Sequence, residues 1–292
     1  IKLEHRGAVS SDGRTGDGAG ILFDIPHDFF KKVCDFELPE PREYGVGMVF
    51  LPKSKNQIDF CKTTFETALK NQNLQLLGWR DVPVDTDNVG VSAKVTMPTI
   101  KQAFIVKNSD ETNFEKRLYI IRKTIENRVL ESDIEQKEFV YMPSMSSNTI
   151  VYKGLLLADQ VAGFYKDLRD ERVESAFALV HQRYSTNTFP SWDLAHPFRY
   201  IAHNGEINTI KGNVNWMSAR EPELYNEVFG DEVKNWTNYI STRCSVKSYT
   251  GNRQTENMEI VNTYNITFTV RNYHSINESM RIIWKGKYYR II

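Results

Sequence analysis

The segment from residue 180 to residue 209 reads Val180-His-Gln-Arg-Tyr-Ser-Thr-Asn-Thr-Phe-Pro-Ser-Trp-Asp-Leu-Ala-His-Pro-Phe-Arg-Tyr-Ile-Ala-His-Asn-Gly-Glu-Ile-Asn-Thr209. Each polar half of it follows an apolar run, Ala176-Phe-Ala-Leu-Val180 or Tyr200-Ile-Ala202. Apolar runs of this kind predict buried strands. Polar side chains at the ends of core strands can form a ligand-binding site, because the rigid strands hold them in place. We therefore expect a site that contains His181, Arg183, Ser185, Thr186, His203, Asn204, Gly205 and Glu206.

These residue types suit the binding of an amino-acid amide. The planar guanidinium of Arg183 can bind a carboxylate at two points. The side chain of Asn204 and the backbone N–H of Gly205 can together stabilise a developing oxyanion. Structural explanations stay open, because Asn-Gly between extended runs also predicts a type I′ hairpin turn. His181 and Arg183 could likewise be a core histidine and a surface ion-pair partner.

The pattern resembles a known family. His-Gln-Arg-Tyr-Ser-Thr-Asn-Thr-Phe-Pro-Ser-Trp followed by His-Asn-Gly-Glu-Ile-Asn-Thr is similar to the class II glutamine amidotransferase domain of glutamate synthase. The resemblance runs from residue 1 to about residue 235. It includes four shorter motifs, Leu3-Glu-His-Arg-Gly-Ala8, Thr15-Gly-Asp-Gly-Ala-Gly20, Gly78-Trp-Arg-Asp-Val-Pro83 and Thr149-Ile-Val-Tyr-Lys-Gly154.

The resemblance implies a role for each matching residue. Arg183 would bind the α-carboxylate of glutamine, with Thr186 beside it. Asn204 and the N–H of Gly205 would form the oxyanion hole, and Arg6 would lie near the nucleophile. In this family the nucleophile is an amino-terminal cysteine whose own α-amine acts as its base. The parent enzyme would hydrolyse glutamine to glutamate and ammonia and use the ammonia to aminate 2-oxoglutarate.

The sequence starts at Ile1, and its cysteines are Cys34, Cys61 and Cys244. We therefore expect a glutaminase-domain fragment that lacks its first strand and nucleophile and is inactive as given. A non-catalytic glutamine-binding pseudoenzyme is the first alternative. A metal-dependent hydrolase that uses His181, His196 and His203, with Asp193, is the second, although these spacings match no helical pair of zinc ligands.

Strands and helices in mixed order predict an α+β fold. The resemblance implies an incomplete four-layer αββα sandwich of the amino-terminal-nucleophile hydrolase type. The amidotransferase domain would span residues 1–235, followed by a tail of unlike composition at 236–292. Residues 237–292 hold eight Lys and Arg against three Glu, with no Asp or Pro. The tail is interpreted as a frame-shift product, with an appended interaction segment or a divergent end of the domain as alternatives.

Composition excludes several classes of protein. The 37 basic and 37 acidic residues balance, which indicates neither a nucleic-acid nor a membrane-surface partner. Three scattered cysteines argue against a disulfide framework and a zinc site. A cytoplasmic location is therefore the default expectation. No apolar run approaches the roughly 20 residues that span a bilayer. The expected partners are glutamine, the remaining synthase domains and a small reductase subunit.

No cofactor is expected in this chain. The resemblance implies that the parent enzyme uses FMN, an iron–sulfur cluster and either NAD(P)H or ferredoxin.

Hydrophobic periodicity predicts the individual elements. Strands are expected at 21–25, 44–51, 102–106, 139–142, 149–152 and 176–180. An alternating strand is expected around Ile266 and Phe268. Helices are expected after a capping box of Ser54 and Gln57, along the stripe from Phe114 to Val129, and at 222–228. Residues 79–83 are read as a turn and residues 211–217 as a loop.

Overall fold

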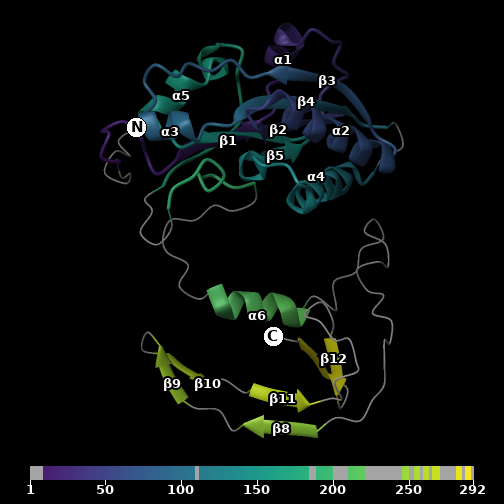
Figure 1. Ribbon diagram of the computed structural model, residues 1–292. Helices are drawn as coiled ribbons and strands as arrows, with labels where there is room; N and C mark the ends of the chain where they lie inside the picture. The colour runs from purple at the N-terminus through teal and green to yellow at the C-terminus, as the bar shows by residue number, and fades with distance from the viewer. Residues whose placement is uncertain are drawn as a thin grey trace. The chain divides into compact units, whose positions relative to one another are not determined.

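The computed structural model describes residues 9–108, 112–183, 189–199 and 210–220, together with six short strands between residues 245 and 290. The chain divides into two compact units, Ile1–Gly230 and Asp231–Ile292. The first unit contains two antiparallel sheets and the helices that pack on them (Figure 1). It holds the residues described below as the candidate site.

The larger sheet has four strands in the order β3-β4-β2-β5. They are β3 (Gln75–Asp81), β4 (Thr99–Val106), β2 (Tyr44–Leu51) and β5 (Tyr141–Ser146), and every pair is antiparallel. All eight residues of β2 are buried. A strand that is buried on both faces reads as a continuous apolar run, which is why β2 was predicted without alternation.

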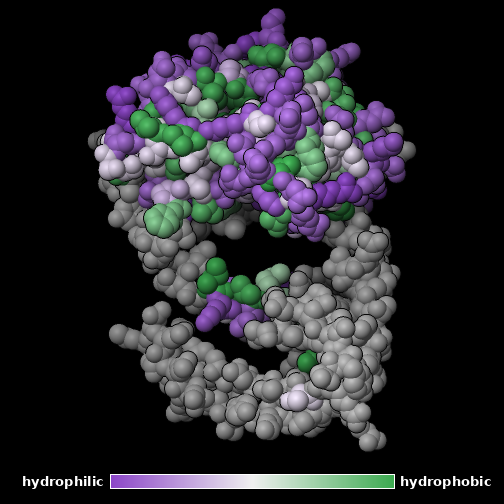
Figure 2. Space-filling view, in the orientation of Figure 1, coloured by the Kyte–Doolittle hydropathy of each residue, from purple (hydrophilic) through white to green (hydrophobic). Residues whose placement is uncertain are grey.

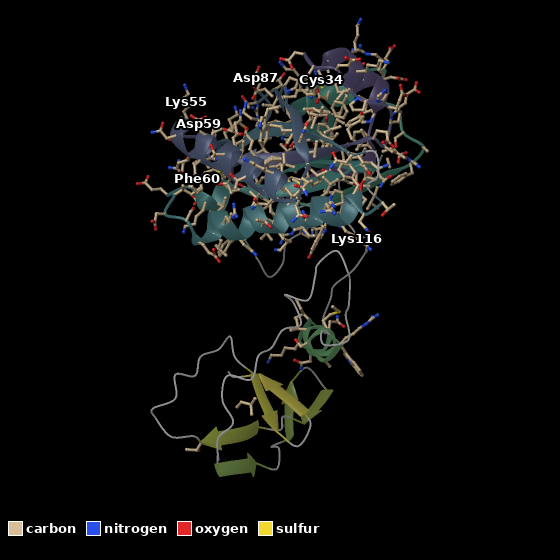
Figure 3. The ribbon with its side chains drawn as sticks, turned by 90° about the vertical axis from the view of Figure 1, so that its right-hand side faces the viewer. Cys34, Lys55, Asp59, Phe60, Asp87 and Lys116 are labelled. Carbon is tan, nitrogen blue, oxygen red and sulfur yellow. The ribbon has the colours of Figure 1, made fainter. Side chains whose placement is uncertain are left out.

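Two long helices cover one face of this sheet (Figure 1). They are α2 (Lys55–Asn71) and α4 (Phe114–Glu131). Apolar residues at helical spacing bury toward the sheet and form the helix-side core, which includes Val49, Leu51, Cys61, Phe65, Leu69, Ala103, Ile105, Leu118, Ile121 and Ile125. On the other side of α2, Lys55 and Asp59 point to solvent (Figure 3). The helix is therefore amphipathic, as its periodicity predicted.

The smaller sheet has three strands in the order β6-β1-β7, namely β6 (Thr149–Gly154), β1 (Ala19–Asp24) and β7 (Ala178–Gln182). It packs against the free face of the four-stranded sheet through the inter-sheet core. That core includes Ala19, Phe23, Phe29, Phe30, Tyr44, Val46, Met48, Phe50, Ile100, Phe104, Ile150 and Tyr152. Alternate residues of β2 thus bury into two different cores.

This arrangement confirms an α+β fold with antiparallel sheets. One helical layer and two sheets are packed face to face in the described residues. The other α-helices among the described residues of the first unit are α1 (His27–Val33), α3 (Val91–Val95), α5 (Val161–Phe164) and α6 (Ile210–Arg220). The side chains of α6 are exposed around the whole helix.

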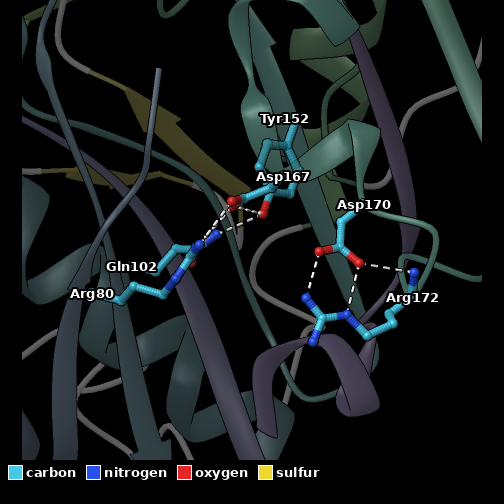
Figure 4. Close-up of polar contacts among 6 residues, drawn as sticks. All are labelled: Arg80, Gln102, Tyr152, Asp167, Asp170 and Arg172. Atoms are coloured by element: carbon cyan, nitrogen blue, oxygen red, sulfur yellow. Dashed lines mark hydrogen bonds and ion pairs between the residues drawn. The ribbon is translucent and has the colours of Figure 1, made fainter. Parts of the chain in front are cut away.

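A buried polar network ties the two sheets together (Figure 4). Arg80 in β3 makes a bidentate ion pair with Asp167, with two N–O distances of 2.7 Å. Arg80 also donates to Gln102 in β4 at 2.8 Å. Tyr152 in β6 donates to Asp167 at 2.9 Å and accepts from Gln102 at 2.8 Å. Each polar group of the network therefore has a partner inside the protein, which is the condition for burying charge without a large loss of stability.

Four predictions about local structure are wrong. The run 176–180 was predicted to be a buried strand, but every residue of β7 is exposed or half-buried. Residues 79–83 were read as a turn, but β3 continues to Asp81, where Arg80 reaches the ion pair. Residues 211–217 were read as a loop, but they lie in α6. The capping box is absent, because Ser54 makes no capping side-chain bond and the Gln57 side chain instead accepts from the N–H of Gln136 at 2.9 Å.

The second unit is described as three antiparallel strand pairs. They are β8 (Ser245–Tyr249) with β11 (Asn265–Thr269), β9 (Arg253–Glu256) with β10 (Glu259–Asn262), and β12 (Arg281–Trp284) with β13 (Lys287–Arg290). The predicted strand around Ile266 and Phe268 is confirmed as β11. The predicted helix at 222–228 lies outside the described residues.

Hydrophilic side chains dominate the visible face of the first unit, and its hydrophobic residues form small separate patches (Figure 2). Among the helices that the structure describes, none combines the length and apolar character needed to cross a bilayer.

Candidate functional site

The pairing of β1 with β7 brings a glycine-rich turn beside the first polar half of the motif. Gly20 lies opposite His181 in the ladder, and the N–H of Arg183 donates to the carbonyl of Gly18 at 2.8 Å. Gly18 has a φ of +127°, a conformation that L side chains rarely adopt. The glycine-rich turn therefore fixes the position of the Arg183 backbone just after the end of β7.

The segment 189–199 passes close to β6, the strand that pairs with β1 on the side away from β7. Gly20 lies between His181 of β7 and Lys153 of β6, so these two side chains share the face of the sheet that turns away from Tyr152. A Cβ on Gly20 would lie 2.5 Å from the Lys153 Cβ and 2.8 Å from the His196 carbonyl oxygen. Only a residue without a side chain lets the segment approach the sheet this closely.

Trp192 anchors the start of this segment. Its ring is buried against Gly154, where a Cβ would come within 2.4 Å of the ring, and its indole N–H donates to the Ala93 carbonyl at 3.1 Å. Ala195, also buried, packs against Gly18, where a Cβ would lie 2.8 Å from the Ala195 Cβ. The two contacts place the Ser-Trp-Asp-Leu-Ala part of the motif beside the turn that supports Arg183.

The rings of His196 and Phe198 pack on side chains of the three-stranded sheet. His196 stacks on His181 with centroids 4.4 Å apart and an angle of 26° between the planes. Phe198 lies next to His196 at 4.5 Å, and the Lys153 Nζ lies 4.5 Å from the Phe198 ring centroid. The two histidines, which are 15 residues apart in the sequence, thus form one cluster with Lys153.

Lys153 is the buried charge of this cluster. Burial lowers its pKa to about 7, and the charges of Arg199 and Arg183 act in the same direction, whereas Asp193 raises it. Its Nζ donates to the main-chain carbonyls of Asp193 at 2.8 Å and Ala195 at 2.7 Å. The charges of Arg183 and Arg199, joined by that of Lys153 only when it is protonated, favour an anionic ligand group in this region.

A sequence model of the class-II glutamine amidotransferases matches residues 1–259. The chain belongs to this family. The match covers both halves of the motif and all of the first unit.

Curated relatives of this amidotransferase chain are glutamate synthases. It is 47% identical over 236 residues to the glutamate synthase [NADPH] large chain of Bacillus subtilis (strain 168), which covers 80% of this chain and 15% of that protein. Identity is 45% to glutamate synthase [NADH] of Saccharomyces cerevisiae, over 80% of this chain and 11% of the relative. The chain is 44% identical to ferredoxin-dependent glutamate synthase 1 of Arabidopsis thaliana, over 76% of this chain and 14% of the relative. The chain thus spans a small part of the length of these relatives.

The predicted site residues of the amidotransferase domain fall into two groups. Arg183 and His181 are described, and the β1–β7 ladder brings them to the glycine-rich turn. Arg6, Ser185, Thr186, His203, Asn204, Gly205 and Glu206 lie outside the described residues. The roles of both groups stay predictions.

The metal-site alternative is not favoured. His181 and His196 do come together, but their rings stack nearly parallel, and stacked rings do not direct their nitrogens at a shared ion. Asp193 accepts from the Ser191 hydroxyl at 2.6 Å. Within the part of the chain that the structure describes, no three His, Cys, Asp or Glu residues are grouped as metal ligands.

The two described cysteines are poor nucleophiles. Cys34 lies at the end of α1 (Figure 3), and Cys61 lies in the helix-side core. Burial raises the pKa of each thiol to about 11, so the reactive thiolate is scarce at neutral pH. The sequence argument that neither replaces the family's nucleophile is consistent with this environment.

Sequence reasoning missed Lys153. The available signal was a lysine inside the apolar run Thr149-Ile-Val-Tyr-Lys-Gly154, because a charged residue in a buried strand needs specific partners. Those partners lie about 40 residues away in the sequence, and periodicity does not identify them.

Proposed function

We propose that the chain is the glutamine-binding domain of a glutamate synthase large chain. In the parent enzyme this domain would hydrolyse glutamine to glutamate and ammonia, and the ammonia would serve the amination of 2-oxoglutarate. The observation that carries the proposal is the 47% identity to a glutamate synthase large chain over 236 residues. The position of Arg183 at the end of β7, beside the glycine-rich turn, supports it.

Each site residue has a proposed role. Arg183 binds the α-carboxylate of glutamine, with Thr186 beside it. Asn204 and the N–H of Gly205 stabilise the oxyanion that forms when the γ-amide is attacked. Arg6 lies near the nucleophile. The positive charge around Arg183 supports the carboxylate assignment, because it favours an anion at the end of β7.

The partners proposed for the parent enzyme are its remaining synthase domains and a small reductase subunit. Its electron donor would be NADPH, NADH or ferredoxin, which are the donors that the names of the relatives give. The residues of this domain do not fit an iron–sulfur cluster, because Cys34 and Cys61 pack in separate cores. We place that cluster and FMN in other parts of the parent enzyme.

The proposed fold is the full four-layer sandwich, with the amidotransferase domain at residues 1–235 and a separate tail at 236–292. A helix with an apolar stripe is needed for the second helical layer. The stripe of α6 supports this role, since Ile210, Val214 and Met217 lie at helical spacing and are all more than half exposed. The family match, which ends at residue 259, leaves the boundary of the domain a prediction.

Calorimetric titration with L-glutamine tests the proposed function. Losing the hydrogen bonds to a charged group removes about 1.5–3 kcal/mol, so Arg183→Gln should weaken binding roughly tenfold to hundredfold. The control is Arg172→Gln, which changes an arginine that pairs with Asp170 on the surface. Equal glutamine affinity in wild type and Arg183→Gln would contradict the carboxylate assignment.

Ammonia release separates hydrolysis from binding alone and so distinguishes the amidotransferase from the non-catalytic alternative. The same assay checks the prediction that this chain is inactive. Cys34→Ser and Cys61→Ser should leave the result unchanged, because both thiols are held in the protonated form.

A further inference from the structure

Lys153 is a fully buried lysine, with 0% of its surface exposed. In the described part of the chain no carboxylate lies within ion-pair distance of its Nζ. Removing an ammonium from water is costly, and a methionine of similar length would occupy the same space without that cost. The lysine is therefore expected to make contacts that an apolar side chain of the same length does not make.

Among the described residues, three of the four close partners of the Lys153 Nζ lie in the segment 189–199, and the fourth is the ring of Tyr141 in β5. The Nζ donates to the carbonyls of Asp193 and Ala195 at 2.8 and 2.7 Å. It also lies 4.5 Å from the centroid of Phe198 and 4.7 Å from that of Tyr141. One side chain thus contacts three positions within six residues of the segment 189–199, which makes it a local clamp.

The clamp joins two parts of the site that are distant in sequence. Lys153 sits in β6, one strand away from β1, and the other neighbour of β1 is β7, which leads into Arg183. The clamped segment runs directly into residues 200–209, which include Asn204 and Gly205. The contacts of Lys153 therefore fix the part of the chain that comes just before the proposed oxyanion-binding residues.

We propose that Lys153 is a positioning residue, which holds the segment 193–198 on the three-stranded sheet and so sets the oxyanion-binding residues relative to Arg183. This inference rests on the proposed function. Either protonation state can maintain the clamp, because a neutral amine still has two N–H donors for the two carbonyls. Its protonated form adds the attraction to the two rings.

Lys153→Met removes the donors and keeps the length of the side chain. Lys53→Met is the matched control, because Lys53 also donates to a backbone carbonyl, that of Val95, and lies 5.4 Å from the centroid of Phe139, but on the surface. Phe198→Leu is a milder second variant, which removes one ring from the clamp and leaves both hydrogen bonds. It keeps the test decisive if Lys153→Met does not fold.

Two measurements are made on each variant of the full 292-residue chain. Hydrogen exchange of peptides from 189–199 reports how firmly the segment is held. Calorimetry compares L-glutamine with an analogue in which a tetrahedral sulfone replaces the side-chain carboxamide and so mimics the tetrahedral oxyanion intermediate. Because misplacing the oxyanion donors affects only the second ligand, a positioning role separates the two affinities, whereas a general loss of structure lowers both.

We expect Lys153→Met to speed exchange in 189–199 about tenfold and to weaken binding of the sulfone about tenfold, with glutamine changed less than threefold. Phe198→Leu should change both quantities in the same direction by less, and Lys53→Met should change neither. Unchanged exchange, or equal loss for the two ligands, would overturn the proposal. If the wild-type chain binds neither ligand, the proposed function fails and the inference falls with it. A normal Arg183→Gln effect with no Lys153→Met effect refutes the inference alone.

Discussion

Asp167→Asn is the substitution whose effect the structure defines most sharply. The two side chains of the Arg80–Asp167 pair are 11% and 3% exposed, so water cannot replace the lost carboxylate (Figure 4). The amide keeps the shape of the side chain but removes its charge and one acceptor oxygen. The guanidinium is then left buried without a counter-charge, and the one remaining oxygen cannot serve the two guanidinium nitrogens and the Tyr152 hydroxyl as the two carboxylate oxygens do.

Removing one partner of a buried ion pair typically costs 3–5 kcal/mol. We expect the lower end, about 3 kcal/mol, because Arg80 retains its hydrogen bond to Gln102 and its position over the rings of Phe29 and Phe30. In a unit of about 230 residues, each kcal/mol lowers Tm by roughly 2–4 °C. Asp167→Asn should therefore lower the Tm of the first unit by roughly 6–12 °C.

Urea and thermal unfolding of Asp167→Asn and Asp170→Asn measure the effect. The control makes the same acid-to-amide change three residues away, where Asp170 forms a bidentate pair with Arg172 (Figure 4). The side chains of that pair are 43% and 25% exposed, so water can replace part of what is lost and we expect little change in stability. A double variant, Arg80→Met with Asp167→Leu, should recover only part of the loss, because it removes the unpaired charge but leaves the Tyr152 hydroxyl without its acceptor and the Gln102 carbonyl without its donor. Similar Tm values for Asp167→Asn and Asp170→Asn would refute the reasoning.

Three further predictions concern the site and the core. Gly20→Ala should destabilise the first unit by about 1–3 kcal/mol, because the new Cβ would lie 2.5 Å from that of Lys153, whereas Gly163→Ala has its closest contact at 3.4 Å and should be tolerated in the same urea titration. Between pH 7 and 10.5 the unfolded chain binds more protons at Lys153 than the folded chain does, because its pKa falls from 10.5 to about 7 on folding. Stability should therefore gain up to about 1.4 kcal/mol per pH unit in that window, and Lys153→Met should remove this gain in pH-dependent unfolding. Cys61 should react with a thiol reagent only after unfolding, because its side chain is 2% exposed, and rapid labelling of the native protein would contradict its place in the helix-side core.

Local patterns predicted the regular elements well where burial alone decides them. The apolar run of β2 and the helical stripe of α4 were both identified, because each buries a face that is visible in the spacing of its own residues. β3 was misread because its exposed and half-buried residues, including Arg80, do not form an apolar run. α6 was misread for a related reason, since Ile210, Val214 and Met217 stand at helical spacing in a segment of otherwise mixed composition and give only a weak periodic signal.

The motif around residues 181–209 was enough to indicate the family and the chemistry of the ligand, because the choice of Arg183, Asn204 and Gly205 reflects what a carboxylate and an oxyanion require. Tertiary structure alone decided which residues support that motif. Lys153 meets the carbonyls of Asp193 and Ala195 only when β6 and β1 are paired, and Arg80 meets Asp167 only when the two sheets are packed. The physical reason is that these contacts join residues 40 to 87 positions apart, where the partner of a buried charge is set by packing of the whole unit and not by its neighbours in sequence.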